Sequence, residues 1–324
     1  MRVLITGITG MVGSHLAEYI LENHPDAEIY GMVRWRSPLD NIQGILDQVT
    51  LVNGDLRDLN SMIKIMKDIR PDRIFHLAAQ SYVTVSFDQP ADTLETNVIG
   101  TTNLLDAIRW AEIDPRIHIC SSSEVYGQVK PDEVPITEHN AMRPASPYAV
   151  SKVGEDMISL QYFLSYGIKT IRTRMFTHTG PRRGDVFAES TFAKQVAEIE
   201  AGIKKNPVKV GNLDSVRTIA DVRDAVRAYW LLLENGIPGE VYNIGGEETM
   251  TIGNILDIYK DLATCDIQHE VDPARLRPSD VTLQIPDISK FKEITGWKAE
   301  ITPRKTFGDL LDYHRQNIKR QNIK

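Results

Sequence analysis

The side chains with the clearest chemistry stand in two separate runs. The first is a Ser-Ser-Ser-Glu run that contains Ser122 and Glu124, and the second places Tyr148 four residues before Lys152. On a helix, residues four apart share one face, so we expect the Lys152 ammonium to favour the tyrosinate and to lower the pKa of Tyr148. Tyr148 could then act as a general base toward a hydroxyl group or as a general acid toward a ketone.

The serines and the glutamate would complete this reaction centre. Ser122 can hydrogen-bond the substrate oxygen on which Tyr148 acts, and Glu124 can take a proton from the carbon beside a ketone. Structural roles are open as well: an exposed Tyr/Lys helix face, a capping or salt-bridging acid at Glu124, and a Ser123 that packs or binds water. A Ser-Pro pair just before Tyr148 favours a helix start there.

A glycine-rich loop near the N-terminus predicts a dinucleotide site. Gly7, Gly10 and Gly13 follow the first apolar run and precede the first helical pattern. Without a Cβ the backbone can approach a pyrophosphate closely, and the helix N-terminus offers free N–H groups. An ordinary glycine turn is the alternative. The other residues expected at the cofactor in this loop are Thr9, Met11 and Val12.

Arginines after the second apolar run favour NADP over NAD. Where a carboxylate often binds the ribose hydroxyls, the chain has Arg34 and Arg36, which suit a 2′-phosphate. A solvated basic turn is the alternative. After the third run, Asp55 and Leu56 could face the adenine, as acceptor and as packing surface. Small residues after the fourth run would let the cofactor lie close to the backbone, and the residues expected there are Leu77, Ala78, Ala79 and Ser81.

Short apolar runs alternate with amphipathic patterns through the first half of the chain. This alternation predicts a doubly wound (Rossmann) α/β fold, a parallel sheet covered on both faces with ligands at the carboxyl ends of its strands. The expected strands are Val3–Thr6, Glu28–Val33, Val49–Val52, Arg73–Leu77, His118–Ser121 and Lys169–Thr173. The expected helices of this half are Ser14–Glu22, Leu59–Asp68, Leu94–Trp110 and Tyr148–Tyr166.

The second half is less regular and richer in turn signals. Its helical patterns are Ser190–Ala201, Asp221–Glu234, Ile252–Ala263 and Pro303–Asn317. We expect residues 1–173, with a return segment at about 213–244, to form the NADP-binding domain. A smaller mixed α/β domain for the substrate would comprise 174–212 and 245–318, and 319–324 would be a solvated tail.

Composition and charge limit the partners. The chain has 324 residues, a formal net charge of −7 and two cysteines. It lacks the basic stripe that nucleic acid requires and any apolar run long enough to cross a bilayer, so we expect neither partner. Cys120 and Cys265 read as buried small residues outside any metal motif. In the absence of such a motif we expect no metal ion. Because we see no signal peptide, we expect a cytoplasmic location.

At this point the chain resembles the extended short-chain dehydrogenase/reductase superfamily. From Gly7 to about Tyr313 it is similar to the GDP-mannose 4,6-dehydratases and the neighbouring GDP-4-keto-6-deoxy-mannose reductases. The run 181–187 is closer to the dehydratases, whereas 219–230 and 276–280 are closer to the reductases. The runs that carry the resemblance are Leu77–Ser81, Val85–Phe87, Pro144–Lys152, Gly180–Gly184, Val210–Arg217 and Leu276–Asp280.

The resemblance implies a role for each matching position. The family's catalytic residues fall on Ser122, Glu124, Tyr148 and Lys152, and positions that contact NADP fall on His178 and Arg183. The positions that hold the nucleotide fall on Phe187, Lys194, Asn212, Arg217 and Arg277. The last two arginines suit a diphosphate. Further residues expected at the substrate are Ser86, Ser123 and Thr177.

Two departures from the family pattern concern the substrate. Thr177 stands where most relatives carry an Asn that helps to hold the sugar, so the sugar specificity is open. Ser122 stands where the dehydratases usually have Thr, which keeps the hydroxyl. Glu124 does not separate the two groups, because both carry a Glu there.

The leading interpretation is a GDP-hexose 4,6-dehydratase, with GDP-mannose as the expected substrate. Tyr148 would remove the O4 proton while hydride passes from C4 to NADP, Glu124 would take the C5 proton as water leaves from C6, and hydride would return to C6. The alternatives are an NADPH-dependent GDP-4-keto-6-deoxy-mannose reductase, a C4 oxidase or epimerase of a related GDP-sugar, and a non-catalytic NADP-sensing scaffold. The resemblance also implies a homodimer or homotetramer.

Overall fold

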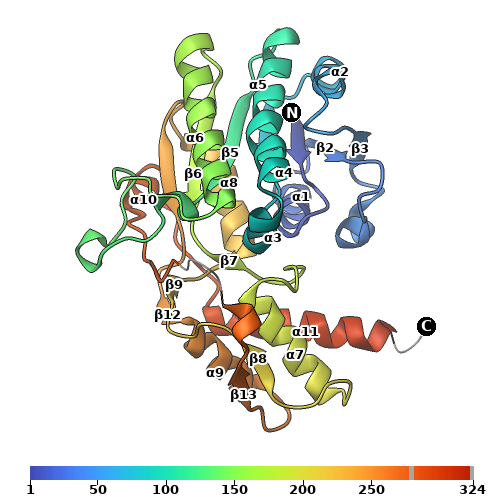
Figure 1. The fold of residues 1–324 in the computed structure, drawn as a ribbon. Coiled ribbons are helices and arrows are strands. Elements are labelled where there is room, and N and C mark those ends of the chain that lie inside the picture. The colour runs from blue at the N-terminus through green and yellow to red at the C-terminus, as the bar shows by residue number, and fades with distance from the viewer. Residues whose placement is uncertain (277–280, 322–324) are drawn as a thin grey trace.

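The centre of the molecule is a seven-stranded parallel sheet with the order β11–β6–β5–β4–β1–β2–β3 (Figure 1). The computed structural model describes residues 1–276 and 281–321, so Arg277, expected at the nucleotide, lies outside the described residues. The strands are β1 (Arg2–Thr6), β2 (Glu28–Val33), β3 (Thr50–Asn53), β4 (Arg73–His76), β5 (Arg116–Ser122), β6 (Thr170–Met175) and β11 (Val241–Ile244).

Helices cover both faces of this sheet. Val3 and Ile5 of β1 point to one side and join a core with α1 and α8, whereas Leu4 points to the other side and joins a core with α2 and α5. α6 packs beside α5 on that second face (Figure 1). The helices are α1 (Met11–Asn23), α2 (Leu59–Ile69), α5 (Gly100–Trp110), α6 (Pro147–Tyr166) and α8 (Val222–Asn235). The doubly wound fold expected from the sequence is therefore confirmed.

Two parts of the main sheet differ from the sequence prediction. All six expected strands form within two residues of their expected ends, but β11 was missed because it is short and lies among turn signals. The helix expected at 94–110 begins earlier and is interrupted by a π-helical turn, since α4 (Pro90–Leu94) leads into η2 (Glu95–Ile99) before α5. A short helix, α3 (Val83–Asp88), was also missed.

Besides the two cores on the faces of the main sheet, a separate core, here named the second core because it belongs to the smaller part of the molecule, lies beyond the carboxyl ends of the main strands, among the elements in the lower part of Figure 1. Phe192, Leu256 and Leu311, from three different helices, pack into it together with β8. Its helices are α7 (Ala188–Glu200), α9 (Ile252–Leu262) and α11 (Pro303–Gln321). Its short strands pair as β8 (Val208–Val210) with β13 (His269–Val271), and as β9 (Val216–Thr218) between β12 (Thr249–Thr251) and β14 (Leu283–Gln284). The exact domain boundaries stay a prediction.

The described part of the expected solvated tail is helical, since α11 continues to Gln321, and Lys319 and Arg320 are exposed. The expectation of two buried cysteines is wrong. Cys265 is exposed and Cys120 is only partly buried, so the two cysteines do not share one environment. Among the described residues no helix is long and apolar enough to cross a membrane.

Candidate active site

A cleft of about 1160 Å³ runs along the carboxyl ends of the main strands and reaches the second core. Its lining begins with residues that directly follow β1, β2, β3 and β4, and it continues across the end of β5 to α7 and β9. The strand order reverses between β1 and β4, which is where a doubly wound sheet opens a crevice for a ligand.

The loop after β1 has no free space for a Cβ at Gly7 or Gly13. Gly7 has a φ of +75°, and a Cβ there would lie 3.0 Å from the backbone nitrogen of Ala78. A Cβ on Gly13 would lie 2.3 Å from the carbonyl oxygen of Gly7, so helix α1 starts directly beneath the loop. Gly10 is the N-cap of α1. This close cradle at a helix N-terminus fits a dinucleotide pyrophosphate.

The start of α6 is fixed by two serines. Ser146 caps the helix by accepting a hydrogen bond from the Ala149 N–H at 3.0 Å. The Tyr148 N–H donates to the Ser86 hydroxyl at 3.1 Å, and this hydroxyl donates to the Val83 carbonyl at 2.6 Å. Ser86 is fully buried and does not line the cleft. The structure therefore places Ser86, expected at the substrate, as an anchor between α3 and α6.

Tyr148 and Lys152 share one face of α6 and both line the cleft. The Lys152 ammonium lies 6.0 Å from the centre of the Tyr148 ring. Burial raises the pKa of Tyr148, and the Lys152 charge and a hydrogen bond with Ser122 act in the opposite direction. The expected effect of Lys152 is present, but the net lowering expected from the sequence is wrong, because burial outweighs it.

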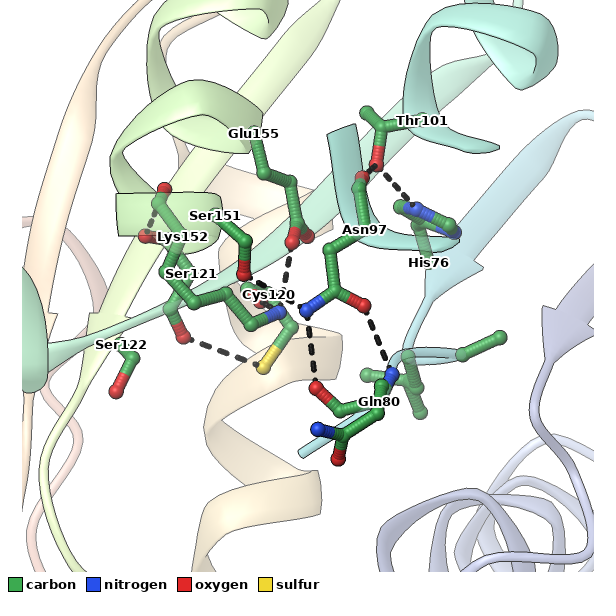
Figure 2. Close-up of polar contacts among 12 residues, drawn as sticks. His76, Gln80, Asn97, Thr101, Cys120, Ser121, Ser122, Ser151, Lys152 and Glu155 are labelled. Carbon is green, nitrogen blue, oxygen red and sulfur yellow. Dashed lines mark hydrogen bonds and ion pairs between the residues drawn. The ribbon is translucent and has the colours of Figure 1, made fainter. Parts of the chain in front are cut away.

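Lys152 is tied down by two acceptors (Figure 2). Its ammonium donates to the Cys120 carbonyl at 2.7 Å and to the Glu155 carboxylate at 2.7 Å. Sequence reasoning missed Glu155, although its position three residues after Lys152 on a predicted helix is a signal for such a pair.

The end of β5 brings the serine and the glutamate into the cleft. Ser122 is the last residue of β5 and caps the short turn that follows, accepting a hydrogen bond from the Glu124 N–H at 3.2 Å. Ser123 is buried and donates to the Gln284 side chain of β14 at 2.9 Å, which links the turn to the second core. Ser122, Ser123 and Glu124 all line the cleft.

A buried amide behind Tyr148 is a second feature that the sequence did not reveal. Asn97, on the π-helical turn, accepts a hydrogen bond from the Gln80 N–H at 2.8 Å and donates to the Gln80 carbonyl at 2.9 Å (Figure 2). It also donates to the Ser151 hydroxyl of α6 at 2.9 Å. Asn97 therefore joins the loop after β4 to the helix that carries the reaction centre.

The cofactor end of the cleft carries positive charge from two strand ends. Arg34, after β2, is exposed and lines the cleft, whereas Arg36 is exposed and lies outside its lining. Asp55 lines the cleft as expected but accepts hydrogen bonds from Arg57, with a closest contact of 3.0 Å. These bonds lower the pKa of Asp55. Arg57 also lies 3.4 Å from Asp92 and was missed by sequence reasoning.

The other wall of the cleft is built around a stacked arginine. The Arg183 guanidinium lies 3.5 Å from the centre of the Phe187 ring, and its Nε lies 3.4 Å from the Glu189 carboxylate. Burial lowers the pKa of His178 to about 4, and the charge of Arg183 adds to this effect. Lys194, expected here, pairs with Asp185 and lies outside the lining.

Most of the expected site residues meet in this one cleft. Those that line it are Gly7, Thr9, Gly10, Met11, Val12, Gly13, Arg34, Asp55, Leu56, Leu77, Ala78, Ala79, Ser81, Ser122, Ser123, Glu124, Tyr148, Lys152, Thr177, His178, Arg183, Phe187, Asn212 and Arg217. Those that do not are Arg36, Ser86 and Lys194. Asp272 and Arg275, which join Asn212 and Arg217 at the far end of the cleft, were missed by sequence reasoning, because no local pattern marks them.

The doubly wound sheet, the glycine cradle and the Tyr/Lys pair beside a strand-end serine define a class of protein. They are the features of a nicotinamide-dependent enzyme of the short-chain dehydrogenase/reductase type. A profile of the family described as GDP-mannose 4,6 dehydratase matches residues 4–309, and the chain belongs to this family.

Curated relatives extend over the whole chain. A GDP-mannose 4,6-dehydratase of Yersinia enterocolitica is 34% identical over 99% of this chain and 96% of its own length. A GDP-6-deoxy-D-mannose reductase of Pseudomonas aeruginosa is 31% identical over 99% of each chain. The sequence resemblance to both groups is therefore confirmed.

Solved structures share the same architecture. RMD from Pseudomonas aeruginosa, complexed with NADPH, has a TM-score of 0.84 and 30% identity, covering 98% of this chain and 99% of that one. A dTDP-glucose 4,6-dehydratase from Streptomyces venezuelae, with NAD bound, has a TM-score of 0.86 and 27% identity, with 98% of each chain covered.

Proposed function

We propose that this protein is an NADP-dependent GDP-sugar 4,6-dehydratase that acts on GDP-mannose. The observation that carries the proposal is the match of the GDP-mannose 4,6 dehydratase profile to residues 4–309, and the cleft adds Glu124 beside Ser122, Tyr148 and Lys152. An elimination next to a ketone needs a base for the carbon-bound proton, besides the group that handles the alcohol proton. The cleft offers both groups.

The residues of the cleft divide the work as follows. Tyr148 takes the proton from O4 while Ser122 orients that oxygen. Glu124 takes the C5 proton and delivers a proton to the hydroxyl that leaves C6 as water. When hydride returns to C6, C5 takes up a proton again, which balances the one that Tyr148 removed from O4. The bound NADP supplies the hydride acceptor for C4 and the hydride donor for C6. The glycine cradle suits its pyrophosphate, and Arg34 and Arg57 suit its 2′-phosphate.

Mass spectrometry of GDP-mannose incubated with purified protein, without added reductant, tests this function. The expected result is a product that has lost one water. Glu124→Gln should still oxidise C4 and accumulate reduced cofactor, but it should not eliminate water. Glu133→Gln, which neutralises an acid outside the cleft, is the matched control and should dehydrate normally. Full dehydration by Glu124→Gln would contradict the role of Glu124.

A reductase is the second candidate, because a reductase of Pseudomonas aeruginosa matches 99% of this chain. It would use Tyr148 as an acid toward a 4-ketone and would need exchangeable NADPH. Unchanged GDP-mannose, together with NADPH-dependent consumption of the GDP-4-keto-6-deoxy sugar, would establish the reductase instead. A protein that binds NADP and converts neither sugar would be the sensing scaffold.

An apolar stripe on α6 supports the proposal of a homodimer, from which a homotetramer could assemble. Val150, Met157 and Leu164 are seven residues apart, so they share one face of the helix, and all three are exposed. Met157→Glu together with Leu164→Glu should reduce the mass measured by light scattering to that of a monomer. Ile203→Glu, at an exposed apolar position away from α6, is the control and should leave the mass unchanged. The cytoplasmic location stays a prediction.

A further inference from the structure

The Lys152–Glu155 ion pair is buried directly beneath the reaction centre. The ammonium and the carboxylate are 2.7 Å apart, and their side chains are only 5% and 2% exposed. Burying two charges costs free energy unless their geometry is good and other hydrogen bonds complete it. Here the Cys120 carbonyl provides the further acceptor at 2.7 Å.

Glu155 acts on the reaction centre only through Lys152. It lies outside the lining of the cleft, whereas Lys152 lies in it. Figure 2 shows Glu155 above Lys152, on the side away from Ser122. Its contact and the contact with Cys120 use two of the three ammonium protons and fix the ammonium 6.0 Å from the Tyr148 ring.

The carboxylate also changes the charge that Tyr148 experiences. Lys152 lowers the pKa of Tyr148, whereas Glu155 raises it. Burial alone would lower the pKa of Lys152, but Glu155 raises it above its ordinary value, so the ammonium stays protonated. Burial raises the pKa of Glu155 to about 7, against the opposing charge of Lys152. Above neutral pH the pair is therefore an ammonium with its charge partly offset.

We propose that Glu155 is a positioning residue of the reaction centre: it fixes the Lys152 ammonium against the Cys120 carbonyl and offsets its charge, so that Tyr148 keeps its proton until cofactor and substrate bind. An unopposed ammonium would favour the tyrosinate in the empty cleft. The ion pair holds the ammonium near Tyr148 without promoting early loss of the Tyr148 proton.

None of the other charged groups described around α6 has the contact with Lys152 that Glu155 has. The titratable and charged groups that affect Tyr148, Lys152 or Glu155, or are affected by them, are His76, His118, Cys120, Asp156, Arg183 and Tyr229. Glu124 faces the same cleft from the end of β5. Asp156, the nearest other carboxylate in sequence, bonds to Arg172 at 2.5 Å and to Arg174 at 2.8 Å, so it is already paired.

A purely structural ion pair is the alternative, and two variants separate it from the proposal. Glu155→Gln removes the charge and keeps an oxygen that can accept from Lys152. Glu155→Asp keeps the charge on a shorter side chain. A structural role predicts a loss of stability in both variants with no change in the titration of Tyr148.

The experiment follows the titration of Tyr148 by NMR in protein labelled with ¹³Cζ-tyrosine. The signal is assigned by its loss in Tyr148→Phe, and circular dichroism confirms folding at each pH. The Tyr148 signal of Glu155→Gln should titrate roughly one pH unit below that of the wild type, since a neighbouring charge shifts a pKa by one unit or more. Glu155→Asp should titrate close to the wild type. A Glu155→Gln signal that does not titrate at lower pH than the wild type overturns the proposal.

This inference rests on the proposed function only in making Tyr148 the proton-transfer group. The titration needs no GDP-sugar, so a protein that fails to dehydrate GDP-mannose can still show the expected shift, and the two failures are distinguishable. In an active preparation, kcat/KM should rise with pH as Tyr148 loses its proton. This rise should occur at lower pH in Glu155→Gln, by the same amount as the shift in the titration.

Discussion

At the scale of single residues, environment separates side chains of the same type. Tyr148 lines the cleft beside Lys152, whereas Tyr126 is fully buried only a few residues after Ser122. The Tyr126 hydroxyl donates to the Asn243 side chain at 2.7 Å and accepts from Arg174 at 3.1 Å. Tyr148 is therefore placed for chemistry, and Tyr126 is placed for stability.

Replacing these tyrosines by phenylalanine should affect different properties, catalysis for Tyr148 and stability for Tyr126. Tyr148→Phe should lower kcat by about 10²–10⁴-fold, because the general base is lost, with little change in the free energy of unfolding. Tyr126→Phe should lower the free energy of unfolding by about 1–3 kcal/mol, because it leaves buried polar partners unsatisfied. Steady-state kinetics and urea unfolding of both variants measure this. A Tyr148→Phe enzyme with wild-type kcat would exclude Tyr148 as the base.

At the scale of elements, the N-terminus of α6 sets the position of the reaction centre. Tyr148 lies within the first turn, so any fraying of the helix start moves it relative to Ser122 of β5. The Ser146 cap, and the hydrogen bond that the Ser86 hydroxyl accepts from the Tyr148 N–H, limit this fraying from two sides.

Removing the α6 cap should therefore affect both stability and activity. Ser146→Ala should lower the free energy of unfolding by about 1 kcal/mol, since it removes an N-cap acceptor, and it should also lower kcat. Asp58→Ala removes the corresponding cap of α2, where the Asp58 carboxylate accepts from the Asn60 N–H at 3.0 Å. This control should lose comparable stability but keep kcat. Equal kcat values in the two variants would argue against the positioning role of the α6 cap.

At the scale of the whole molecule, the cleft exists because two separate cores meet along the carboxyl ends of the sheet. The doubly wound part contributes the cradle and the Tyr/Lys pair of α6, and elements of the second core contribute Phe187, the N-cap of α7, and Arg217 of β9. Two histidines are buried within the main sheet, His76 of β4 and His118 of β5. They form hydrogen bonds with the hydroxyl groups of Thr101 and Thr173.

These histidines should make the stability of the whole chain depend on pH. Burial lowers the pKa of both to about 3, below the ordinary value of about 6.5 in an unfolded chain. Between these two pKa values the unfolded state therefore binds more protons than the folded state. The contribution of each histidine to the free energy of unfolding is complete above pH 6.5, and it decreases by about 1.4 kcal/mol for each unit by which the pH is lowered.

Urea unfolding between about pH 7 and pH 5 measures this dependence. Below pH 6.5 the free energy of unfolding should fall, with His178 and His314, whose pKa values are lowered to about 4, adding to the slope, and His118→Gln should reduce the slope by about one proton. Most carboxylates contribute at lower pH, near their ordinary pKa values of about 4, whereas Glu155, with its pKa raised to about 7, contributes in this window with the opposite sign in wild type and variant alike. An unchanged slope in His118→Gln would show that this histidine does not carry the effect.

The sequence by itself determined the features that depend on residues close together in the chain. Short apolar runs and amphipathic helical patterns located six strands and most helices, and the glycine spacing located the cradle at Gly7 and Gly13. The four-residue spacing of Tyr148 and Lys152 fixed their shared face, because helical geometry is local. These patterns were sufficient for the fold class, the glycine cradle and the Tyr/Lys pair, and the resemblance to a known family added the residues of the far wall.

Only the tertiary structure decided which partner each polar side chain finds. Ser86 turned out to anchor α6, Asp55 is engaged by Arg57, and Lys152 bonds to the Cys120 carbonyl, 32 residues earlier in the chain. The net pKa shift of Tyr148 likewise depends on burial, which arises from packing between distant elements. Local patterns carry no information about such contacts, because hydrogen bonds and desolvation act through space between segments that sequence order does not pair.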